Sequence, residues 1–280
     1  METYLFLAIF FFFGAALGSF LNVVAWRIVR GETFTRGRSY CPHCRRKLSW
    51  VDLIPVLSFI VLCGRCRTCR APISYRYFLV ECLMGFYIAL LIYFAINGGL
   101  LSPFPFLTAV WGSVFESAIL AGMYLLVAAI VLVISLIDYE TKLILVTPLR
   151  FLGVLGLAAV LTGLMLAPDV SARAFVVRHL LLAVATGGFF VLVWVLTRGR
   201  GMGLGDAELG SVLALFLPWP LAIPMLLFAF WSGALVGVTL IVLYKYRPRA
   251  EIPFGPFLAL GFALALFGGR MLLSNFMIMI

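Results

Sequence analysis

Four cysteines in two C-x2-C pairs form the clearest chemical pattern in this sequence of 280 residues. The pairs are separated by 21 residues, a spacing at which four thiolates can surround one Zn²⁺ as a tetrahedron. Four sulfur ligands leave no open coordination position, so the pattern predicts a structural zinc and not a catalytic one. The alternative is a set of thiols that are merely buried or redox-active. The predicted ligands are Cys41, Cys44, Cys66 and Cys69.

Two other residues near these cysteines are alternative ligands. His43 and Cys63 could substitute for one of the four, although neither has a paired spacing, and Cys82 is expected to be a packing residue within a helix. Basic residues flank the pairs and favour the thiolate form that binds metal. They are Arg45, Arg46, Lys47, Arg65, Arg67 and Arg70.

Two aspartates form a second candidate functional site. Asp138 ends a long apolar run, and Asp206 begins another directly after a glycine-rich segment. An ionisable side chain at such a depth in an apolar segment is costly and is by default a candidate for function. Two neighbouring carboxyl groups do not both ionise easily, so one can act as an acid and the other as a base toward water. This is the chemistry of aspartic peptidases.

The glycines before Asp206 are part of this candidate site. Gly203 and Gly205 complete a G-x-G-D pattern and are expected to give the backbone freedom, through positive φ and close approach of another segment. The alternative for Asp206 is a structural role as the N-cap of the helix that follows. Its occurrence together with Asp138 favours the catalytic interpretation.

The elements that must position these residues are membrane helices. Apolar residues make up 64% of the chain and charged residues only 11%, with a mean hydropathy of +1.16, which excludes a soluble domain. The predicted fold is an all-α polytopic membrane protein with about eight transmembrane helices and a zinc-ribbon-like loop. The apolar runs lie at 4–26, 77–96, 117–137, 143–166, 179–197, 207–217, 221–243 and 255–278.

The run at 207–217 is an exception because it stops at Pro218-Trp219-Pro220. Eleven helical residues reach only about 16 Å. Either the helix continues through a proline kink, or the segment is re-entrant, which is tolerated where protein surrounds the backbone.

The distribution of charge predicts the orientation. Eighteen of the 21 Lys and Arg residues fall in four loops, at 27–76, 138–150, 198–206 and 245–249. The positive-inside rule places these loops in the cytosol, together with both aspartates and the cysteines. No positive residue precedes the first apolar run, so this run is expected to stay as a membrane helix and not to be a cleaved signal peptide. A reducing cytosol disfavours disulfides between the four cysteines.

The sequence resembles the bacterial type IV prepilin peptidases, membrane aspartic peptidases of the G-x-G-D kind. The resemblance extends over nearly the whole chain and rests on ordered motifs. These are Gly18-Ser-Phe-Leu-Asn22 with Arg27, Cys41-Pro-His-Cys44, Trp50-Val-Asp52-Leu-Ile-Pro55, Gly64-Arg-Cys66-Arg-Thr-Cys69, Ile73-Ser74, Val80-Glu81, Ile137-Asp138, Gly203-Leu-Gly-Asp206 and Ile252-Pro-Phe-Gly-Pro256.

The resemblance implies removal of the leader from type IV prepilins and type II secretion pseudopilins at the cytosolic side of the bacterial inner membrane. It also implies methylation of the new N-terminus with S-adenosylmethionine. The matching positions make Asp138 and Asp206 the catalytic pair and the four cysteines zinc ligands. Glu81 matches an acid near the methylation region, and its alternative is a charge at a helix end that extends toward water.

Three parts are therefore expected: a first transmembrane helix at 1–26, a cytosolic four-cysteine loop at 27–76, and a transmembrane peptidase core at 77–280. The expected partners are prepilin substrates and the lipid bilayer, and no nucleic acid. The main alternative is a transporter or channel that uses the same buried acids to bind a proton or cation.

Overall fold

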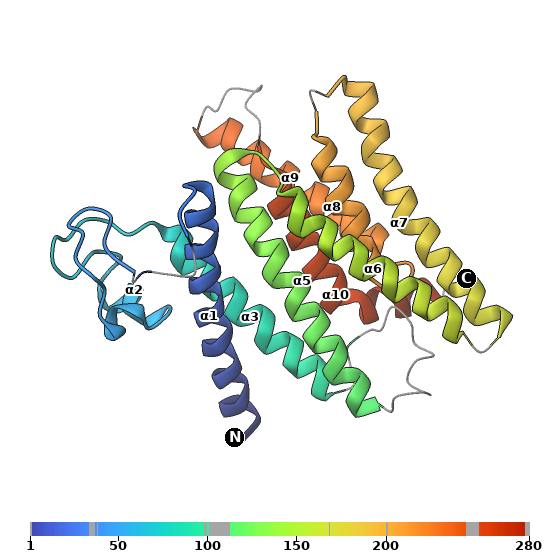
Figure 1. The fold of residues 1–280 in the computed structure, drawn as a ribbon, viewed down its shortest axis with the longest axis horizontal. Helices are drawn as coiled ribbons and strands as arrows, with labels where there is room; N and C mark the ends of the chain where they lie inside the picture. The colour runs from blue at the N-terminus through green and yellow to red at the C-terminus, as the bar shows by residue number, and fades with distance from the viewer. Residues whose placement is uncertain are drawn as a thin grey trace. The chain divides into compact units, whose positions relative to one another are not determined.

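The fold is almost entirely helical (Figure 1). The computed structural model describes residues 2–33, 37, 39–97, 100, 113–167, 169–199, 201–244 and 252–277. The chain divides into two compact units, Met1–Tyr93 and Phe94–Ile280. The basic loop expected at 245–249 and the last residue of the run at 255–278 lie outside the described residues.

The first unit consists of two long apolar helices and the cysteine loop that joins them. The helices pack closely because glycines face the partner: a Cβ on Gly14 or Gly18 of α1 would lie within 3.0 Å of α3 atoms. Two short helical segments, η1 and α2, lie within the loop. The elements are α1 (Glu2–Val29), η1 (Trp50–Leu53), α2 (Leu57–Val61) and α3 (Tyr75–Ile96).

The second unit is a bundle of helices that holds both aspartates. In it α8 packs against α6 and α7, and α10 packs against α5, α8 and α9. The bundle is built from α5 (Ser113–Thr141), α6 (Val146–Leu166), α7 (Val170–Thr197), α8 (Leu204–Leu215), α9 (Ala222–Tyr244) and α10 (Gly255–Met277).

The predicted polytopic helical architecture is confirmed. Six helices of the described residues are long and apolar enough to cross a membrane, while the apolar part of α10 is shorter, at Gly255–Gly269. Together with α8 they account for the eight predicted runs. The six lie at Thr3–Val29, Tyr75–Ile96, Glu116–Thr141, Val146–Leu166, Val170–Thr197 and Ala222–Leu243.

The helix α8 does not continue through the proline segment. It ends at Leu215 after 12 residues, about 18 Å, which is too short to span the hydrocarbon core. Two buried side chains bind the carbonyls at its end: the Tyr124 hydroxyl donates to Phe216 O at 2.9 Å, and His179 Nε2 donates to Leu215 O at 2.9 Å. These bonds replace the water that such a helix end lacks inside the protein.

The helix α7 begins nine residues before the run predicted at 179–197. Asp169 provides the start, since its carboxylate accepts a hydrogen bond from Ala172 N at 2.7 Å as an N-cap. The predicted run begins only after Arg173 and Arg178, which is too late. Long basic side chains are tolerated near the ends of membrane helices, so the helix includes both residues.

Candidate functional site

The four predicted zinc ligands converge in space. The four Sγ atoms all lie within 4.8 Å of one another, and those of Cys41 and Cys69 are 3.8 Å apart. Sulfurs at about 2.3 Å from a tetrahedral Zn²⁺ would be separated by about 3.8 Å. His43 and Cys63 are exposed and are not members of this cluster.

The backbone of each C-x2-C pair turns tightly around its sulfurs. Isolated β-bridges close the turns, joining Tyr40 to Lys47 in the first and Arg65 to Pro72 in the second. In the first turn, Arg45 N donates to Cys41 O at 2.9 Å, and Arg45 adopts a φ of 55°. Each pair therefore forms a compact turn that brings its two sulfurs together.

Thiols held this closely compete for negative charge. Backbone N–H groups of Cys69 and Thr68 lower the pKa of Cys66 to about 6. The Ala71 N–H lowers the pKa of Cys69, but burial and the neighbouring thiols outweigh it and raise that pKa to about 11. A divalent cation would relieve the competition, so the donor set suits a metal such as zinc.

Asp52 links the two cysteine pairs through arginines. Its carboxylate forms ion pairs with Arg46, which follows the first pair, at 2.6 Å, and with Arg67, inside the second pair, at 2.7 Å. Burial acts to raise the pKa of Asp52, but hydrogen bonds from Arg67 and Ser49 and the charge of Arg46 hold it well below its usual range. In the sequence Asp52 is only part of a motif, and its ion pairs could not be predicted because the partners lie six and 15 residues away.

Asp138 lies near the C-terminal end of α5 and is only 4% exposed. Its Oδ2 accepts a hydrogen bond of 2.9 Å from the backbone N–H of Gly255, the first residue of α10. That N–H has no partner within its own helix, and the positive end of the helix dipole favours a carboxylate.

Asp206 is the third residue of α8 and is 8% exposed. Its Oδ2 accepts a hydrogen bond of 3.0 Å from the N–H of Gly203, the residue that caps the helix. Asp206 is therefore not the N-cap of α8, since Gly203 has that position. Its carboxylate instead binds the backbone N–H of the N-cap residue and so has a structural role in the first turn.

The two carboxyl groups lie within electrostatic range of each other. Burial raises the pKa of Asp206, the Gly203 N–H lowers it, and the negative charge of Asp138 raises it, to a result of about 6. A carboxyl with such a pKa can hold or release a proton near neutral pH. The bundle thus brings together two acids that are 68 positions apart in the sequence.

Neither glycine of the G-x-G-D segment has a positive φ, and only Gly205 is required by a close approach. Gly203 has a φ of −84°. A Cβ on Gly205 would lie 3.0 Å from the side chain of Ile144, in the turn that follows α5. The absence of a side chain at Gly205 therefore lets α8 start beside the segment that carries Asp138.

Glu81 is buried in the first unit, within α3. Its Oε2 accepts a hydrogen bond of 2.7 Å from the N–H of Val56, which has a φ of 63°, a conformation rare for a β-branched residue. Asn22 on α1 is fully buried, and neither its amide nitrogen nor its oxygen has a hydrogen-bond partner among the described residues. The unit therefore holds an acid and an unpaired amide inside an apolar helix pair.

Sequence reasoning missed two residues near Asp138. Gly255 was noted only as part of a motif, and its contact with Asp138 spans 117 positions. Ser135, three residues before Asp138, is buried and its hydroxyl has no hydrogen-bond partner among the described residues. In contrast, Thr141 and Thr186 donate to the carbonyl four residues earlier, as helical hydroxyls in apolar surroundings often do.

The fold and the site together define a polytopic helical membrane protein with a pair of buried carboxyl groups. It also has a loop in which four cysteines are arranged as they are in metal-binding loops. Comparison with known families places the chain within that class. Residues 12–95 match the bacterial peptidase A24 N-terminal domain, and residues 125–238 match the type IV leader peptidase family. The chain belongs to the type IV leader peptidase family.

Several relatives share most of the chain, each described as a prepilin leader peptidase/N-methyltransferase. That of Myxococcus xanthus is 33% identical over 88% of this chain and 67% of its own length. The relative from Aeromonas hydrophila is 31% identical over 98% of this chain and 96% of its own length. The relative from Bacillus subtilis is 29% identical over 96% of this chain and 96% of its own length. No solved structure matches the chain.

Proposed function

We propose that this protein is an aspartic endopeptidase that removes the leader of type IV prepilins and pseudopilins, with Asp138 and Asp206 as its catalytic pair. The main support is the pair itself: two buried carboxyl groups, each bound by a backbone N–H at the start of a helix, within range of each other. The relatives' shared description gives the substrate class.

The chemistry requires one ionised and one protonated carboxyl. The ionised carboxylate accepts a proton from water as the water oxygen bonds to the scissile carbonyl carbon, and the protonated carboxyl donates a hydrogen bond to the carbonyl oxygen. The tetrahedral intermediate then loses the amine, which takes up a proton from the pair as the C–N bond breaks. Neither carboxyl needs to form a covalent bond with the substrate.

The decisive experiment is mass spectrometry of a prepilin co-expressed with this protein. The expected product lacks the leader and, if methylation occurs, carries one added methyl group. An unprocessed prepilin in the presence of folded, membrane-inserted protein would contradict the proposal, and would favour the transporter or channel, a class that none of the relatives supports.

We propose a cytosolic, inner-membrane setting for the site and for the cysteine loop, supported by the concentration of Lys and Arg in four loops. Within it we propose three parts: a first membrane helix at 1–26, which α1 continues to Val29, a zinc loop at 27–76, and a peptidase core at 77–280. Prepilin substrates and the bilayer are the proposed partners.

The cysteine cluster is proposed to hold one structural zinc, which supplies folding free energy to the loop, on the order of 10 kcal/mol or more in small zinc peptides. Elemental analysis of the purified protein should give about one zinc per chain. The double change Cys41→Ser and Cys44→Ser should abolish it and make the loop sensitive to protease. Cys63→Ser is the matched control, since that exposed thiol lies outside the cluster, and should keep the zinc. A full zinc content in the double variant would contradict the assignment.

N-methylation with S-adenosylmethionine is proposed from the relatives' description, and the buried Glu81 and the unpaired Asn22 fit a polar, charged cofactor. When bound, the cofactor supplies the methyl group. The residues of this chain would bind and orient it next to the cysteine loop.

We expect Glu81→Gln to lower methylation more than cleavage. A glutamine keeps an oxygen that can accept from Val56 N, so the loop stays attached to α3 while the negative charge is lost. The ratio of methylated to unmethylated mature pilin in one mass spectrum measures both activities. Glu81→Ala, which also loses the acceptor, should in addition loosen the loop. An equal loss of both activities in Glu81→Gln would argue against a separate methylation site.

A further inference from the structure

The segment formed by η1 and α2 exposes an apolar surface that the proposed peptidase chemistry does not use. Trp50 is 77% exposed and Val61 76%, although both lie in a loop outside the spanning helices. We call this surface the tryptophan patch. Its residues are Trp50, Val51, Leu53, Leu57, Ile60 and Val61.

The attachment of this segment to α3 fixes its depth relative to the membrane helices of its own unit. Val56, at the start of α2, donates its N–H to Glu81, the seventh residue of α3. Six residues of helix correspond to about 9 Å, so α2 lies beside the first turns of α3 and not beyond its end. The Phe59 ring of α2 also stacks on Phe78 of α3, with centroids 5.1 Å apart.

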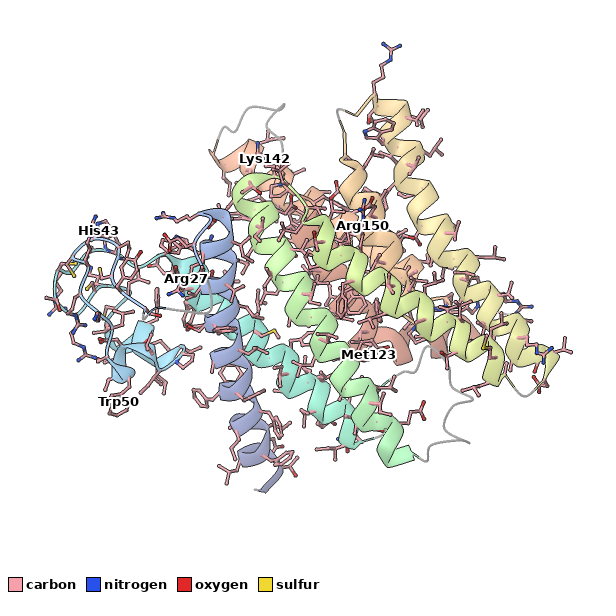
Figure 2. All side chains as sticks on the ribbon, viewed as in Figure 1. Arg27, His43, Trp50, Met123, Lys142 and Arg150 are labelled. Atoms are coloured by element: carbon pink, nitrogen blue, oxygen red, sulfur yellow. The ribbon has the colours of Figure 1, made fainter. Side chains whose placement is uncertain are left out.

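The contacts with α1 agree with this depth. Tyr40, next to the first cysteine pair, packs edge to face on Trp26, within the spanning part of α1, with centroids 6.4 Å apart. Figure 1 shows the loop alongside the part of α1 that ends at Val29. Figure 2 shows Trp50 and His43 on opposite sides of the loop.

The charge of the loop matches an anionic surface. Between residues 33 and 80 the chain has nine Lys and Arg residues and one acid, Asp52. The carboxylate of Asp52 is neutralised by Arg46 and Arg67. The loop that carries the patch therefore has a strongly positive net charge, as do segments that bind anionic lipid head groups.

We propose that the tryptophan patch is an interfacial membrane anchor, inserted among the lipid head groups and upper acyl chains beside α1 and α3, with the neighbouring basic residues on anionic head groups. A depth of about 5–10 Å is where amphipathic segments insert, and tryptophan is enriched there. The anchor holds the cysteine loop flat on the membrane. This inference is independent of the peptidase reaction.

Quenching by brominated lipid tests the anchor directly. The full-length protein is placed in nanodiscs of phosphatidylglycerol and phosphatidylcholine with dibrominated acyl chains, and the emission of Trp50 is obtained as wild type minus Trp50→Phe. We expect bromolipid to quench at least about half of the Trp50 emission, and aqueous iodide to leave it almost unchanged. Trp231, 64% exposed on the spanning helix α9, is the matched control through Trp231→Phe and should be quenched in the same way.

A second reporter, Val61→Trp in the Trp50→Phe background, should show the same quenching, whereas His43→Trp in that background should respond to iodide and not to bromolipid. Quenching of Trp50 by iodide alone would overturn the proposal. Protection from iodide only after prepilin is added would also overturn it and would assign the patch to the substrate. Equal quenching in nanodiscs of phosphatidylcholine alone would overturn the contribution of the basic residues.

Discussion

Asp138→Asn and Asp206→Asn should each lower the rate of leader removal by about 10²–10⁴-fold, because each removes one of the two carboxyl groups that exchange protons with the substrate and water. Asparagine keeps an oxygen that can accept the hydrogen bond from Gly255 N or Gly203 N, so the local backbone should not move. The measurement is the initial rate of prepilin cleavage by purified variants in one lipid composition, with substrate binding assayed separately.

Glu140→Gln and Glu208→Gln are the matched controls for this prediction. Both side chains are exposed and lie two residues after a proposed catalytic aspartate. They should retain most of the activity, since neither carboxylate is part of the buried pair. If a folded Asp206→Asn protein cleaved at a rate near that of the wild type, the aspartic mechanism would be wrong and Asp206 would only close the first turn of α8.

The same pair predicts how cleavage depends on pH. At low pH both carboxyl groups are protonated and no base remains. As pH rises past the pKa of Asp206, about 6, the shared proton is lost and no acid remains. The rate should therefore pass through a maximum, and its two apparent pKa values belong to the pair and not to either residue. A rate independent of pH between 4 and 9 would contradict this.

The cost of keeping Asp206 buried should be visible in stability. Its pKa is higher in the folded protein than the ordinary value of 3.8, so the folded state binds the proton more tightly, and stability falls as pH rises from about 4 to about 6. Above this range the ionised group opposes folding. Asp206→Asn should therefore melt at the same or a higher temperature than the wild type at pH 8, which separates loss of activity from loss of fold.

The parts of the site that depend on local spacing could be predicted from the sequence. The metal-binding type of cluster follows from two C-x2-C pairs, because each short turn positions two sulfurs by itself. The membrane helices follow from composition, since apolar length and the bilayer thickness match. The predicted start of α7 was wrong. The N-cap at Asp169 begins the helix before the charged residues at which the apolar pattern is interrupted.

The contacts that position the site could not be predicted, because they join distant segments through backbone groups. The N–H of Gly255 reaches Asp138, and the N–H of Val56 reaches Glu81, yet neither donor has a side-chain identity that marks it as a partner. The end of α8 depends in the same way on Tyr124 and on a histidine of α7. Such partners become visible only when packing places helix ends beside one another.

Gly255 should be sensitive to substitution because it lies directly against Asp138. A Cβ at Gly255 would lie 2.7 Å from Oδ2 of Asp138, closer than carbon and oxygen atoms can approach without a shift. The neighbouring Pro253 and Pro256 have no N–H, so a displaced Asp138 would find no replacement donor on either residue. We therefore assign Gly255 as a positioning residue for the proposed reaction.

Gly255→Ala should lower kcat by about 10²-fold while KM and the melting temperature stay near the wild-type values, because the carboxylate at the end of a flexible side chain is what must move. Gly122→Ala, on the same helix as Asp138, and Gly188→Ala are the controls: a Cβ at either position meets no atom within 4 Å, so both variants should keep full activity. The pH–rate profile gives a readout that a merely structural defect would not change. The N–H of Gly255 binds the carboxylate of Asp138, so its displacement should change the pH–rate profile of the pair. A lower kcat with an unshifted profile, or wild-type activity in Gly255→Ala, would show that the N–H of Gly255 does not set the position of Asp138.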